Sequence, residues 1–368
     1  MKVILAAGGS GGHIFPSIAL ADELKKRENS DIFFVSSKRR LDKNIFKGSK
    51  YPCFFLSINP MPLTFNVVKI VGFILKFFKD MVWSFYIILK VKPDVVVGFG
   101  GYSSGTICVA AKVFRVPILL HEQNYVPGRA NKILCRIADS VALSFDGTDK
   151  YFANVKTKIV HSGNPLRIDA LLNDRDVSAK KLGLFLDRKT VLIMGGSQGC
   201  SFLNETVSRT AVIMNKKMPQ KLQFIHHTGP KDYARIKQFY EENAVSGKVF
   251  SFLETISDAY AASDLAVTRS GAAAVFELAY YSRAMILVPY PNPKNNQRSN
   301  ARYFADKKAA VYKEEGTFSA ENLAEEIYAI LFDEKKLYEL SQSAGRLACP
   351  SAGKNLAEEV FSLAVKNR

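Results

Sequence analysis

Two glycine-rich turns in this sequence have the residue types and spacing of sites that hold a phosphate group. The first occupies residues 7–13 (AGGSGGH) and the second residues 194–199 (MGGSQG), and each lies between an apolar run and a helical pattern. Glycine lets the backbone approach a ligand closely, and the helix that follows offers unpaired N–H groups and the positive end of its dipole. The sequence therefore predicts two anion-binding turns, one in each half of the chain.

His13 comes directly after the first turn and falls in the opening turn of the helix predicted around Pro16. A neutral imidazole at this position can act as a general base toward a ligand held by the turn. It can equally cap the helix or hydrogen-bond the turn itself. The sequence leaves both roles open.

A third glycine turn and a polar tetrapeptide also follow apolar runs in the first half of the chain. The turn contains Gly100, Gly101 and Tyr102, and the tetrapeptide is residues 121–124 (HEQN). Polar residues immediately after a buried strand lie at the carboxyl edge of a sheet, where open α/β folds bind ligands. We therefore expect a ligand site there, with a solvated loop as the alternative.

In the second half, small residues open a helix at residues 268–274 (TRSGAAA), and Glu277 lies one to two turns into it. Such a helix start allows close approach of a ligand, and a carboxylate can accept hydrogen bonds from both hydroxyls of a ribose. The amides Asn295, Asn296 and Gln297 offer the donors and acceptors that sugar hydroxyls need. A charge on a helix surface and a polar helix start are the ordinary alternatives for these positions.

The elements that must position these residues follow from the alternation of apolar, β-branched runs with helical patterns. This alternation indicates parallel sheets covered by helices on both faces. The predicted fold class is α/β, with two Rossmann-like doubly wound domains facing across a cleft. They span residues 1–163 and 164–351, with a hinge at 163–167 and a C-terminal helix at 352–368 that packs back on the first domain. The predicted strands lie near 2–6, 31–36, 53–58, 94–98, 117–121, 140–143, 190–194, 222–227, 248–252, 264–268, 284–288 and 309–312.

Composition limits the partners and the compartment. The chain has 368 residues and a formal charge of +17, which favours a polyanionic partner such as nucleic acid, anionic lipid or a phosphorylated small molecule. The sequence lacks nucleic-acid motifs, so we expect no nucleic-acid partner. Five scattered cysteines without a C-x-x-C pair suggest neither disulfides nor a zinc site. Because a strand is predicted directly after Met1, with no secretory signal, we expect a cytoplasmic protein.

Residues 67–91 have a helical pattern that is much more apolar than a surface helix requires. The length approaches that of a bilayer span, but Lys76, Lys79 and Asp80 lie in the middle, where each charge costs about 2.5–3.5 kcal/mol on insertion scales. An interfacial helix with lysines at acidic headgroups fits better, and burial in the first domain is the alternative. The predicted membrane contacts are Val71, Leu75, Phe78 and Met81, with Lys69, Lys76 and Lys79.

Six motifs, in order along the chain, resemble those of the MurG family of peptidoglycan glycosyltransferases. They are GGSGGH at 8–13, HEQN at 121–124, GNPLR at 163–167, GGSQG at 195–199, RSGA at 269–272 and the segment 297–301. The resemblance implies a GT-B fold and an inverting, metal-independent transfer of N-acetylglucosamine from its UDP donor to the 4-hydroxyl of the muramyl sugar of lipid I, which gives lipid II. It implies a peripheral enzyme on the cytoplasmic face of the cell membrane, without a cofactor. The implied partners are UDP-N-acetylglucosamine, undecaprenyl-linked lipid I, an anionic membrane surface and other cell-wall synthesis proteins.

The resemblance also assigns roles to individual positions. It places Ser197 at the donor diphosphate, Leu253 at the uracil and Glu277 at the ribose. The implied donor-binding residues are Arg167, Ser197, Gln198, Gly199, Leu253, Ala272, Ala273, Ala274, Glu277, Asn296 and Gln297. The acceptor-binding candidates, taken from the resemblance together with the third turn, are Ser10, Gly11, Gly12, His13, Gly100, Gly101, Tyr102 and Asn124, with His13 and Asn124 as catalytic candidates.

Two positions depart from the family pattern. His227 stands where the family commonly has glutamine, and Asn296 is shorter than the usual side chain. Either change can retune the contacts to the sugar.

An inverting transfer needs a base for the acceptor hydroxyl and stabilisation for the departing diphosphate. His13 is our candidate base, and the helix dipole behind Ser197 together with Arg167 can act where other glycosyltransferases use a metal. The D-x-D sequence at 174–176 lies in the polar hinge rather than after a strand. We treat it as a chance match and expect no metal requirement.

Three alternatives remain open at this point. One is another GT-B enzyme that makes diacylglycerol glycolipids. A second is an NADP-dependent Rossmann oxidoreductase, because residues 36–40 (SSKRR) at the end of the second strand exclude NAD but tolerate NADP. The third is a non-catalytic lipid-binding scaffold, against which the duplicated turns count.

Overall fold

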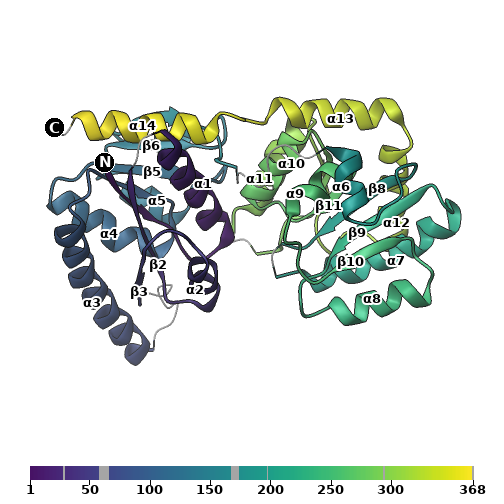
Figure 1. Ribbon diagram of the computed structural model, residues 1–368, viewed down its shortest axis with the longest axis horizontal. Coiled ribbons are helices and arrows are strands. Elements are labelled where there is room, and N and C mark those ends of the chain that lie inside the picture. The colour runs from purple at the N-terminus through teal and green to yellow at the C-terminus, as the bar shows by residue number, and fades with distance from the viewer. Residues whose placement is uncertain (28–29, 58–65, 167–173, 197, 293–294, 367–368) are drawn as a thin grey trace. The chain divides into compact units, whose positions relative to one another are not determined.

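The apolar runs of the sequence form two parallel sheets, shown in the ribbon of the computed structural model (Figure 1). The structure describes residues 1–27, 30–57, 66–166, 174–196, 198–292 and 295–366. The chain divides into unit 1, Met1–Arg167 with Cys349–Arg368, and unit 2, Ile168–Ala348. The sequence alone places the boundary at 163/164 and the return to the first domain at 352.

Within the described residues, unit 1 has a seven-stranded sheet in the order β3-β2-β1-β4-β5-β6-β7, with every neighbouring pair parallel. The order reverses between β1 and β4, and open α/β sheets bind ligands at the carboxyl ends of the strands beside such a switch point. β7 has no counterpart among the predicted strands. The strands are β1 Lys2–Ala6, β2 Asp31–Ser37, β3 Cys53–Leu56, β4 Val95–Gly98, β5 Ile118–Glu122, β6 Ser140–Leu143 and β7 Lys158–His161.

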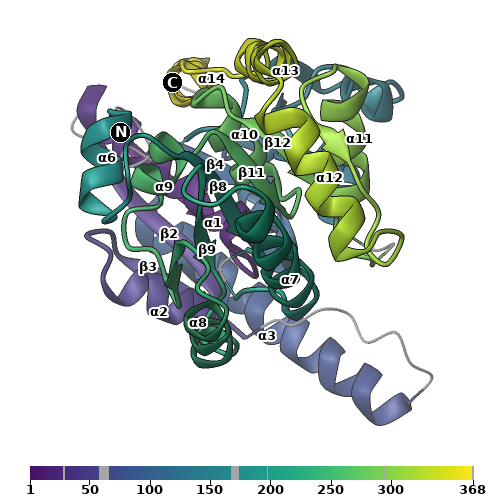
Figure 2. The same ribbon diagram turned by 90° about the vertical axis from the view of Figure 1, so that its right-hand side faces the viewer.

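Helices cover both faces of this sheet, so unit 1 has a hydrophobic core on each side (Figures 1 and 2). On one side α1, α2 and the C-terminal α14 contribute Leu20, Phe46 and Leu356. On the other side α3 and α4 contribute Ile87 and Ile107. The helices of this unit are α1 Gly11–Arg27, α2 Arg40–Lys47, α3 Val67–Val91, α4 Gly101–Val113, α5 Arg129–Leu134 and α14 Ala352–Lys366, with a short 3-10 helix at Asp149–Phe152.

In its described residues, unit 2 has a six-stranded parallel sheet in the order β10-β9-β8-β11-β12-β13, so its switch point lies between β8 and β11. A core around Phe224 on β9 includes Leu203 of α7 and Ile327 of α12. The strands are β8 Lys189–Met194, β9 Leu222–His227, β10 Gly247–Phe250, β11 Leu265–Thr268, β12 Ala284–Leu287 and β13 Val311–Tyr312. The helices are α6 Arg175–Lys181, α7 Ser201–Lys217, α8 Tyr233–Glu242, α9 Ile256–Ala262, α10 Ala272–Tyr280, α11 Gln297–Asp306, α12 Ala320–Leu331 and α13 Glu334–Arg346.

The apolar segment 67–91 is helix α3, as predicted. Its start is fixed by the Asn66 side chain, whose oxygen accepts a hydrogen bond from the Lys69 N–H at 3.1 Å. It ends at Lys92, which has a left-handed backbone (φ 51°). Figure 2 shows the N-terminal part of α3 projecting beyond the other elements of unit 1. This part of the helix therefore has little of unit 1 to bury its apolar side chains against.

Candidate active site

The first and third glycine turns meet at the switch point of unit 1. The first turn follows β1 and leads into α1, and the third follows β4 and leads into α4. Gly101 has a positive φ of 75°, and a Cβ added there would lie 3.0 Å from the carbonyl oxygen of Gly8. Glycine is required at position 101 because the two turns pack backbone to backbone. The N-termini of α1 and α4 are thereby brought to the same part of the sheet edge.

His13 hydrogen-bonds the first turn through one ring nitrogen. Its Nδ1 lies 3.1 Å from the Gly8 carbonyl oxygen and 3.2 Å from Ser10 Oγ. A bond to the carbonyl requires a hydrogen on Nδ1, which leaves the lone pair of the neutral ring on Nε2. That Nε2 lies 3.6 Å from the position of a Cβ added at Gly100. The two roles left open by the sequence are thus compatible, because the nitrogen that holds the turn is not the one that would accept a proton.

Glu122 holds the candidate residue Asn124 in place. Its carboxylate is 1% exposed. Oε1 accepts hydrogen bonds from the Asn124 backbone N–H (2.9 Å) and side-chain amide (3.1 Å), and Oε2 accepts from Gly128 N (2.9 Å) and Asn131 Nδ2 (2.8 Å). Asn124 itself is half-buried at the carboxyl end of β5. Glu122 and Asn131 are therefore positioning residues: the sequence placed Glu122 in the polar tetrapeptide without assigning it this role, and it gave no indication of Asn131.

His121 is a structural histidine. Its Nε2 lies 3.1 Å from the carbonyl oxygen of Gly163 and its Nδ1 lies 2.9 Å from the side-chain amide of Gln123. Complete burial lowers the pKa of this imidazole to about 4, so it is neutral at physiological pH. The ring ties the end of β5 to the segment that leaves unit 1.

Asp42, on α2, holds the first turn through a hydrogen bond from the backbone N–H of Gly9. It is fully buried, and its Oδ2 accepts hydrogen bonds from Gly9 N (2.9 Å) and from the hydroxyls of Ser36 (3.2 Å) and Ser37 (2.5 Å). The signal available in the sequence was the serine pair within residues 36–40, the segment that by itself excludes NAD and tolerates NADP. The carboxylate fixes the turn through backbone and side chain together.

In unit 2 the second glycine turn lies at the corresponding place, after β8 and before α7. Ser197 lies outside the described residues. Gly199 has a positive φ of 76° and donates its N–H to the Gly196 carbonyl oxygen at 2.9 Å. A Cβ on Gly199 would collide with the carbonyl oxygen of Thr228. The turn is therefore packed tightly against the loop after β9, and the first N–H groups of α7 lie directly behind it.

Glu277 is a buried residue of α10, not the surface charge that the sequence also allowed. It is 4% exposed, and its Oε2 accepts a hydrogen bond from the hydroxyl of Tyr260 at 2.7 Å. Tyr260 lies on α9 and was not identified from the sequence. Ala272 is the first residue of α10, with Ala273 and Ala274 half-buried beside it.

Arg269, directly after β11, binds both the loop after β12 and the residue after the second glycine turn. Its Nη1 donates to the carbonyl oxygens of Val288 (3.1 Å) and Pro289 (2.9 Å), and its Nη2 lies 2.7 Å from Cys200 Sγ. It also forms an ion pair with Glu315. The buried guanidinium therefore links the residue after the second glycine turn to the ends of β11 and β12.

The amide pair lies at the start of α11. Asn296 is the N-cap of this helix, and the Oε1 of Gln297 accepts a hydrogen bond from Tyr290 N at 3.0 Å. The hydroxyl of Ser270 donates to the Gln297 carbonyl oxygen at 2.7 Å, which places the amides beside the turn before α10. Asn296 and Gln297 are both half-buried.

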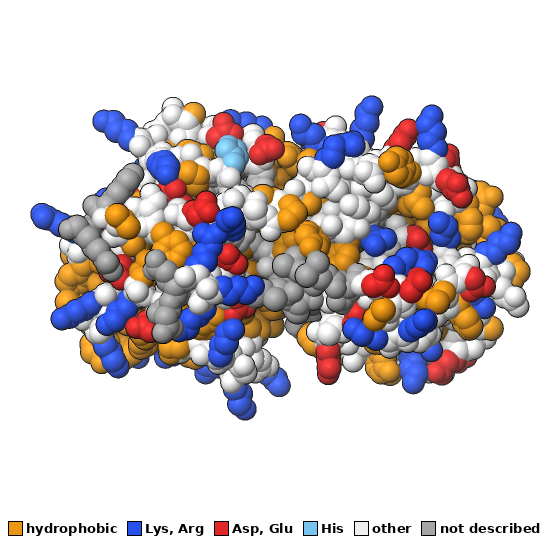
Figure 3. All heavy atoms as spheres, turned by 45° about the horizontal axis from the view of Figure 1, so that its top comes forward, with side chains coloured by type: hydrophobic (Ala, Val, Ile, Leu, Met, Phe, Trp, Pro, Cys, Tyr) orange, Lys and Arg blue, Asp and Glu red, His pale blue; other side chains and the backbone are white. Residues whose placement is uncertain are grey.

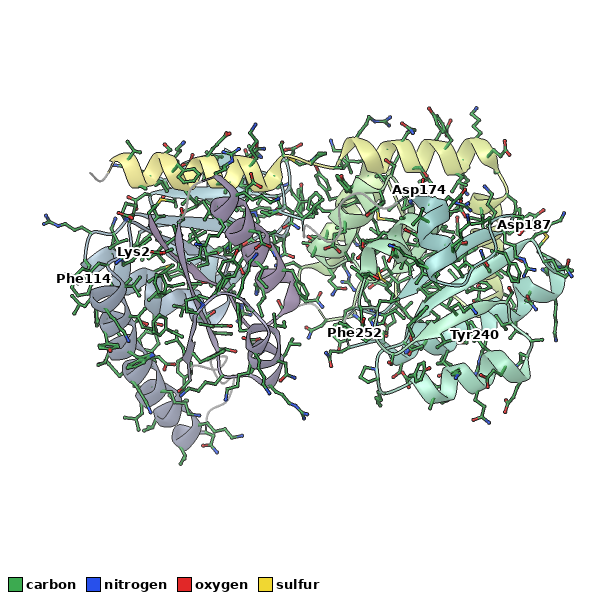
Figure 4. The ribbon with its side chains drawn as sticks, in the orientation of Figure 1. Lys2, Phe114, Asp174, Asp187, Tyr240 and Phe252 are labelled. Carbon is green, nitrogen blue, oxygen red and sulfur yellow. The ribbon has the colours of Figure 1, made fainter. Side chains whose placement is uncertain are left out.

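Two neighbouring positions at the end of β10 differ in exposure. Leu253, assigned to the uracil by the resemblance, is 7% exposed, whereas Phe252, which is labelled in Figure 4, is 64% exposed. The buried His227 has its ring centroid 6.4 Å from that of Phe252, and its Nε2 has no hydrogen-bond partner among the described residues. Burial lowers the pKa of His227. The exposed apolar surface here is therefore that of Phe252.

The apolar face of α3 is largely exposed. Val71, Leu75 and Phe78 are 46%, 65% and 62% exposed, but Met81 is half-buried and lies off this face. Lys69, Lys76 and Lys79 are exposed, and Figure 3 shows Lys and Arg side chains beside hydrophobic ones on the visible face of unit 1. The exposed apolar residues of α3 that the sequence analysis missed are Val68, Ile74, Val82, Trp83, Tyr86 and Leu89. Among the described helices, none combines the length and apolar character needed to cross a bilayer.

The D-x-D sequence at 174–176 has a structural role. The Asp174 side chain caps α6, accepting hydrogen bonds from the N–H groups of Asp176 (2.9 Å) and Val177 (3.0 Å) (Figure 4). In the part of the chain that the structure describes, no three His, Cys, Asp or Glu side chains are grouped as metal ligands. Arg167 lies outside the described residues.

Each unit matches the model of a known protein family. Residues 3–143 match the glycosyltransferase family 28 N-terminal domain and residues 190–356 match the family 28 C-terminal domain. UDP-N-acetylglucosamine–N-acetylmuramyl-(pentapeptide) pyrophosphoryl-undecaprenol N-acetylglucosamine transferase from Halothermothrix orenii is 32% identical over 97% of this chain and 97% of its own length. The chain belongs to glycosyltransferase family 28. The enzyme of the same name from Acetivibrio thermocellus is 33% identical over 100% of this chain and 99% of its own.

Solved structures agree with this family membership. The crystal structure of Acinetobacter baumannii MurG matches with a TM-score of 0.77 and 25% identity over 98% of this chain and 99% of that one. A UDP-N-acetylglucosamine 2-epimerase matches with a TM-score of 0.70 at 15% identity, which indicates a shared fold alone. The predicted MurG resemblance and GT-B fold are confirmed, and the alternative of an NADP-dependent oxidoreductase is wrong.

Proposed function

We propose that this family 28 protein transfers N-acetylglucosamine from UDP-N-acetylglucosamine to the 4-hydroxyl of the muramyl sugar of undecaprenyl-linked lipid I, forming lipid II for peptidoglycan. The observation that carries the proposal is the placement of one glycine turn at the switch point of each sheet. The reaction has two diphosphate-bearing substrates, so it needs two such sites. The full-length similarity to transferases of this name supports the same assignment.

The donor is assigned to unit 2. Its diphosphate would lie on the turn that contains Ser197, Gln198 and Gly199, with the N-terminus of α7 behind it. The ribose hydroxyls would meet Glu277, whose carboxylate is held by Tyr260. Asn296 and Gln297 would then meet the sugar. As the C1–O bond to the diphosphate breaks, negative charge develops on the departing UDP, and backbone amides with Arg167 would stabilise it without a metal.

The acceptor is assigned to unit 1. Its diphosphate would lie on the first turn, at the start of α1, with Asn124 at the reaction centre. The 4-hydroxyl would lose its proton to Nε2 of His13 while its oxygen bonds to the anomeric carbon of the donor. The bond from Nδ1 to the Gly8 carbonyl keeps the required tautomer.

We also propose that α3 places the enzyme on the cytoplasmic face of the membrane. The exposed Val71, Leu75 and Phe78 would enter the headgroup boundary, and the lysines of the same helix would meet anionic lipid. Such a contact would bring the enzyme to a lipid-linked acceptor. Other cell-wall synthesis proteins are the further partners that we propose.

The test is transfer of radiolabelled N-acetylglucosamine from its UDP donor to a lipid I analogue, with a chelator present. We expect a labelled disaccharide lipid and no dependence on added divalent metal. Transfer to diacylglycerol instead of the muramyl acceptor would support the glycolipid alternative. Binding of both substrates without turnover would support the scaffold.

One substitution at position 13 separates a base from a residue that only holds the turn. In His13→Asn the side-chain amide can replace Nδ1 in the bond to Gly8, but nothing replaces Nε2. We expect kcat to fall by about 10²–10⁴-fold with the donor KM unchanged, as for loss of a general base. Normal turnover by this variant would leave His13 with the structural role only.

A further inference from the structure

A groove lies between the edge strand β3 and helix α3, and no residue of the glycine turns is among its lining residues. It encloses about 740 Å³ and is walled mainly by Phe54 and Phe55 of β3 and by Val82 and Trp83 of α3. Small-molecule sites have volumes of roughly 300–1,000 Å³ and mostly apolar walls, so the groove has the size and lining of a binding site. Nothing in the proposed function accounts for it.

The positive groups of the groove are exposed, whereas its negative group is buried. Lys38 and Lys79 line it, and both are exposed. Asp80 also lines it but is only 2% exposed, with its Oδ1 accepting a hydrogen bond from Ser57 N at 3.0 Å. The accessible charge is therefore positive, and apart from the half-buried Ser57 the other lining residues are apolar.

The groove is connected to the first glycine turn through consecutive residues. Lys38 lines the groove and donates its backbone N–H to the Leu56 carbonyl oxygen at 2.9 Å, at the end of β3. The next residue, Arg39, donates from Nη1 to the carbonyl oxygen of Gly9 at 3.3 Å. The chain after β2 thus borders the groove at one residue and the anion-binding turn at the next.

The groove is also continuous with the exposed apolar face of α3. Val82 is 69% exposed and Trp83 is 42% exposed, so both belong to the groove wall and to the outer face. Trp83 stacks on Tyr86 with ring centroids 4.9 Å apart, and Lys90 Nζ lies 5.6 Å from the Tyr86 centroid. A stacked Trp–Tyr pair beside a lysine is typical of a membrane–water boundary.

We propose that this groove holds the first isoprenoid units of the lipid-linked acceptor, between the diphosphate on the first turn and the bilayer at α3. The inference rests on the proposed function. An apolar chain fits the walls, Lys38 lies on the side of the groove that leads through Arg39 to the glycine turn, and the outer end, with Lys79, opens on the apolar face of α3. The link through Arg39 to Gly9 favours the acceptor chain over the acyl chain of a bulk phospholipid, which would need no access to the glycine turn.

Trp83 is the only tryptophan of the chain and reports directly on the groove. Farnesyl diphosphate, an isoprenoid diphosphate used here without membranes, should shift the emission of Trp83 to shorter wavelength. Inorganic diphosphate should compete with it but cause no such shift. An identical response to both ligands, or none to farnesyl diphosphate, would overturn the proposal.

Two exposed valines of α3 give a matched pair of variants. Val82 lines the groove, whereas Val68, 80% exposed on the same helix, does not. With a soluble farnesyl-linked acceptor and no membrane, Val82→Asp should raise the acceptor KM about tenfold, because the removal of one or two buried methylene contacts has this effect. Its kcat and donor KM should stay unchanged, and Val68→Asp should leave all three unchanged. Equal behaviour of the two variants would contradict the groove.

A third measurement separates the acceptor chain from a phospholipid. In vesicles that contain brominated phosphatidylglycerol, bromine quenches Trp83 when a phospholipid chain lies beside it. A saturating lipid I analogue should reduce this quenching in part, because it covers the groove side of Trp83 while the exposed outer edge of the ring stays at the bilayer. Quenching that the analogue does not reduce at all would show that the acceptor chain does not displace phospholipid from Trp83 and would overturn the proposal. Failure of the proposed function would instead appear as no transfer at all to the farnesyl-linked acceptor by the unmodified protein.

Discussion

Replacing Glu122 by Gln tests whether a buried carboxylate holds Asn124 at the reaction centre. The carboxylate accepts four hydrogen bonds from Asn124, Gly128 and Asn131. The glutamine amide keeps one acceptor oxygen and presents an NH₂ group to two N–H donors, so two of the four donors lose the bond to this side chain.

The size of the effect follows from these contacts. A buried donor left unpaired costs about 1–3 kcal/mol and a part-buried donor costs about the lower value, so the free energy of unfolding of unit 1 should fall by about 2–4 kcal/mol. If the lost bonds are those from Asn124, its side chain moves, and a displacement near 1 Å lowers turnover by about a hundredfold. We therefore expect kcat to fall about a hundredfold, with the KM for UDP-N-acetylglucosamine unchanged because the donor is assigned to unit 2.

Steady-state transfer assays and urea unfolding measure these two quantities. Glu359→Gln is the matched control, because Glu359 is another buried carboxylate of unit 1 whose Oε2 pairs with Lys158 Nζ at 2.6 Å. It should lower stability without lowering kcat. Unchanged turnover in Glu122→Gln, or an equal loss of turnover in Glu359→Gln, would refute the positioning role.

Three further outcomes are expected. In Gly199→Ala the new Cβ would collide with a backbone carbonyl and displace the second glycine turn. We therefore expect calorimetry to detect no binding of UDP. Retained affinity would show that this turn does not hold the donor. In Tyr260→Phe, Glu277 loses a charge-assisted hydrogen bond worth at least about 1.4 kcal/mol. We therefore expect the donor KM to rise about tenfold at constant kcat. An unchanged donor KM would show that Glu277 does not bind the ribose. Burial lowers the pKa of His121 to about 4 and of His226 to about 3, below the unfolded value of about 6.5. Their contribution to stability is complete above pH 6.5 and is lost as the pH falls toward 4, at about 1.4 kcal/mol per pH unit for each histidine. Urea midpoints measured from pH 7.5 to 4.5 check this, and midpoints that do not fall with pH would contradict it.

The sheets could be predicted because their strands are buried apolar runs bounded by turn residues. Each of the twelve predicted strands overlaps a strand of the structure. β7 was missed because it is a four-residue edge strand, and Lys158 and His161 at its two ends are exposed. Its apolar run consists of only Ile159 and Val160, and a run of two residues cannot be distinguished from a loop by its pattern.

The backbone of the candidate site was also predictable, but the side chains that support it were not. Glycine turns can be recognised in a sequence because glycine is the residue that their backbone conformation favours. Asp42 supports Gly9 from 33 positions away, and Tyr260 supports Glu277 from another helix. Such pairings depend on how the helices pack, which periodicity does not specify. Met81 shows the same limit, since the sequence predicted it as a membrane contact but the fold leaves it half-buried beside the exposed face.

A crystal structure with UDP-N-acetylglucosamine bound tests the central claim most directly, namely that each unit holds one diphosphate on its own glycine turn. The account predicts the donor diphosphate on the backbone amides at 198–199 and at the start of α7, with the ribose at Glu277. A nucleotide bound instead on the first turn, beside His13, would contradict it.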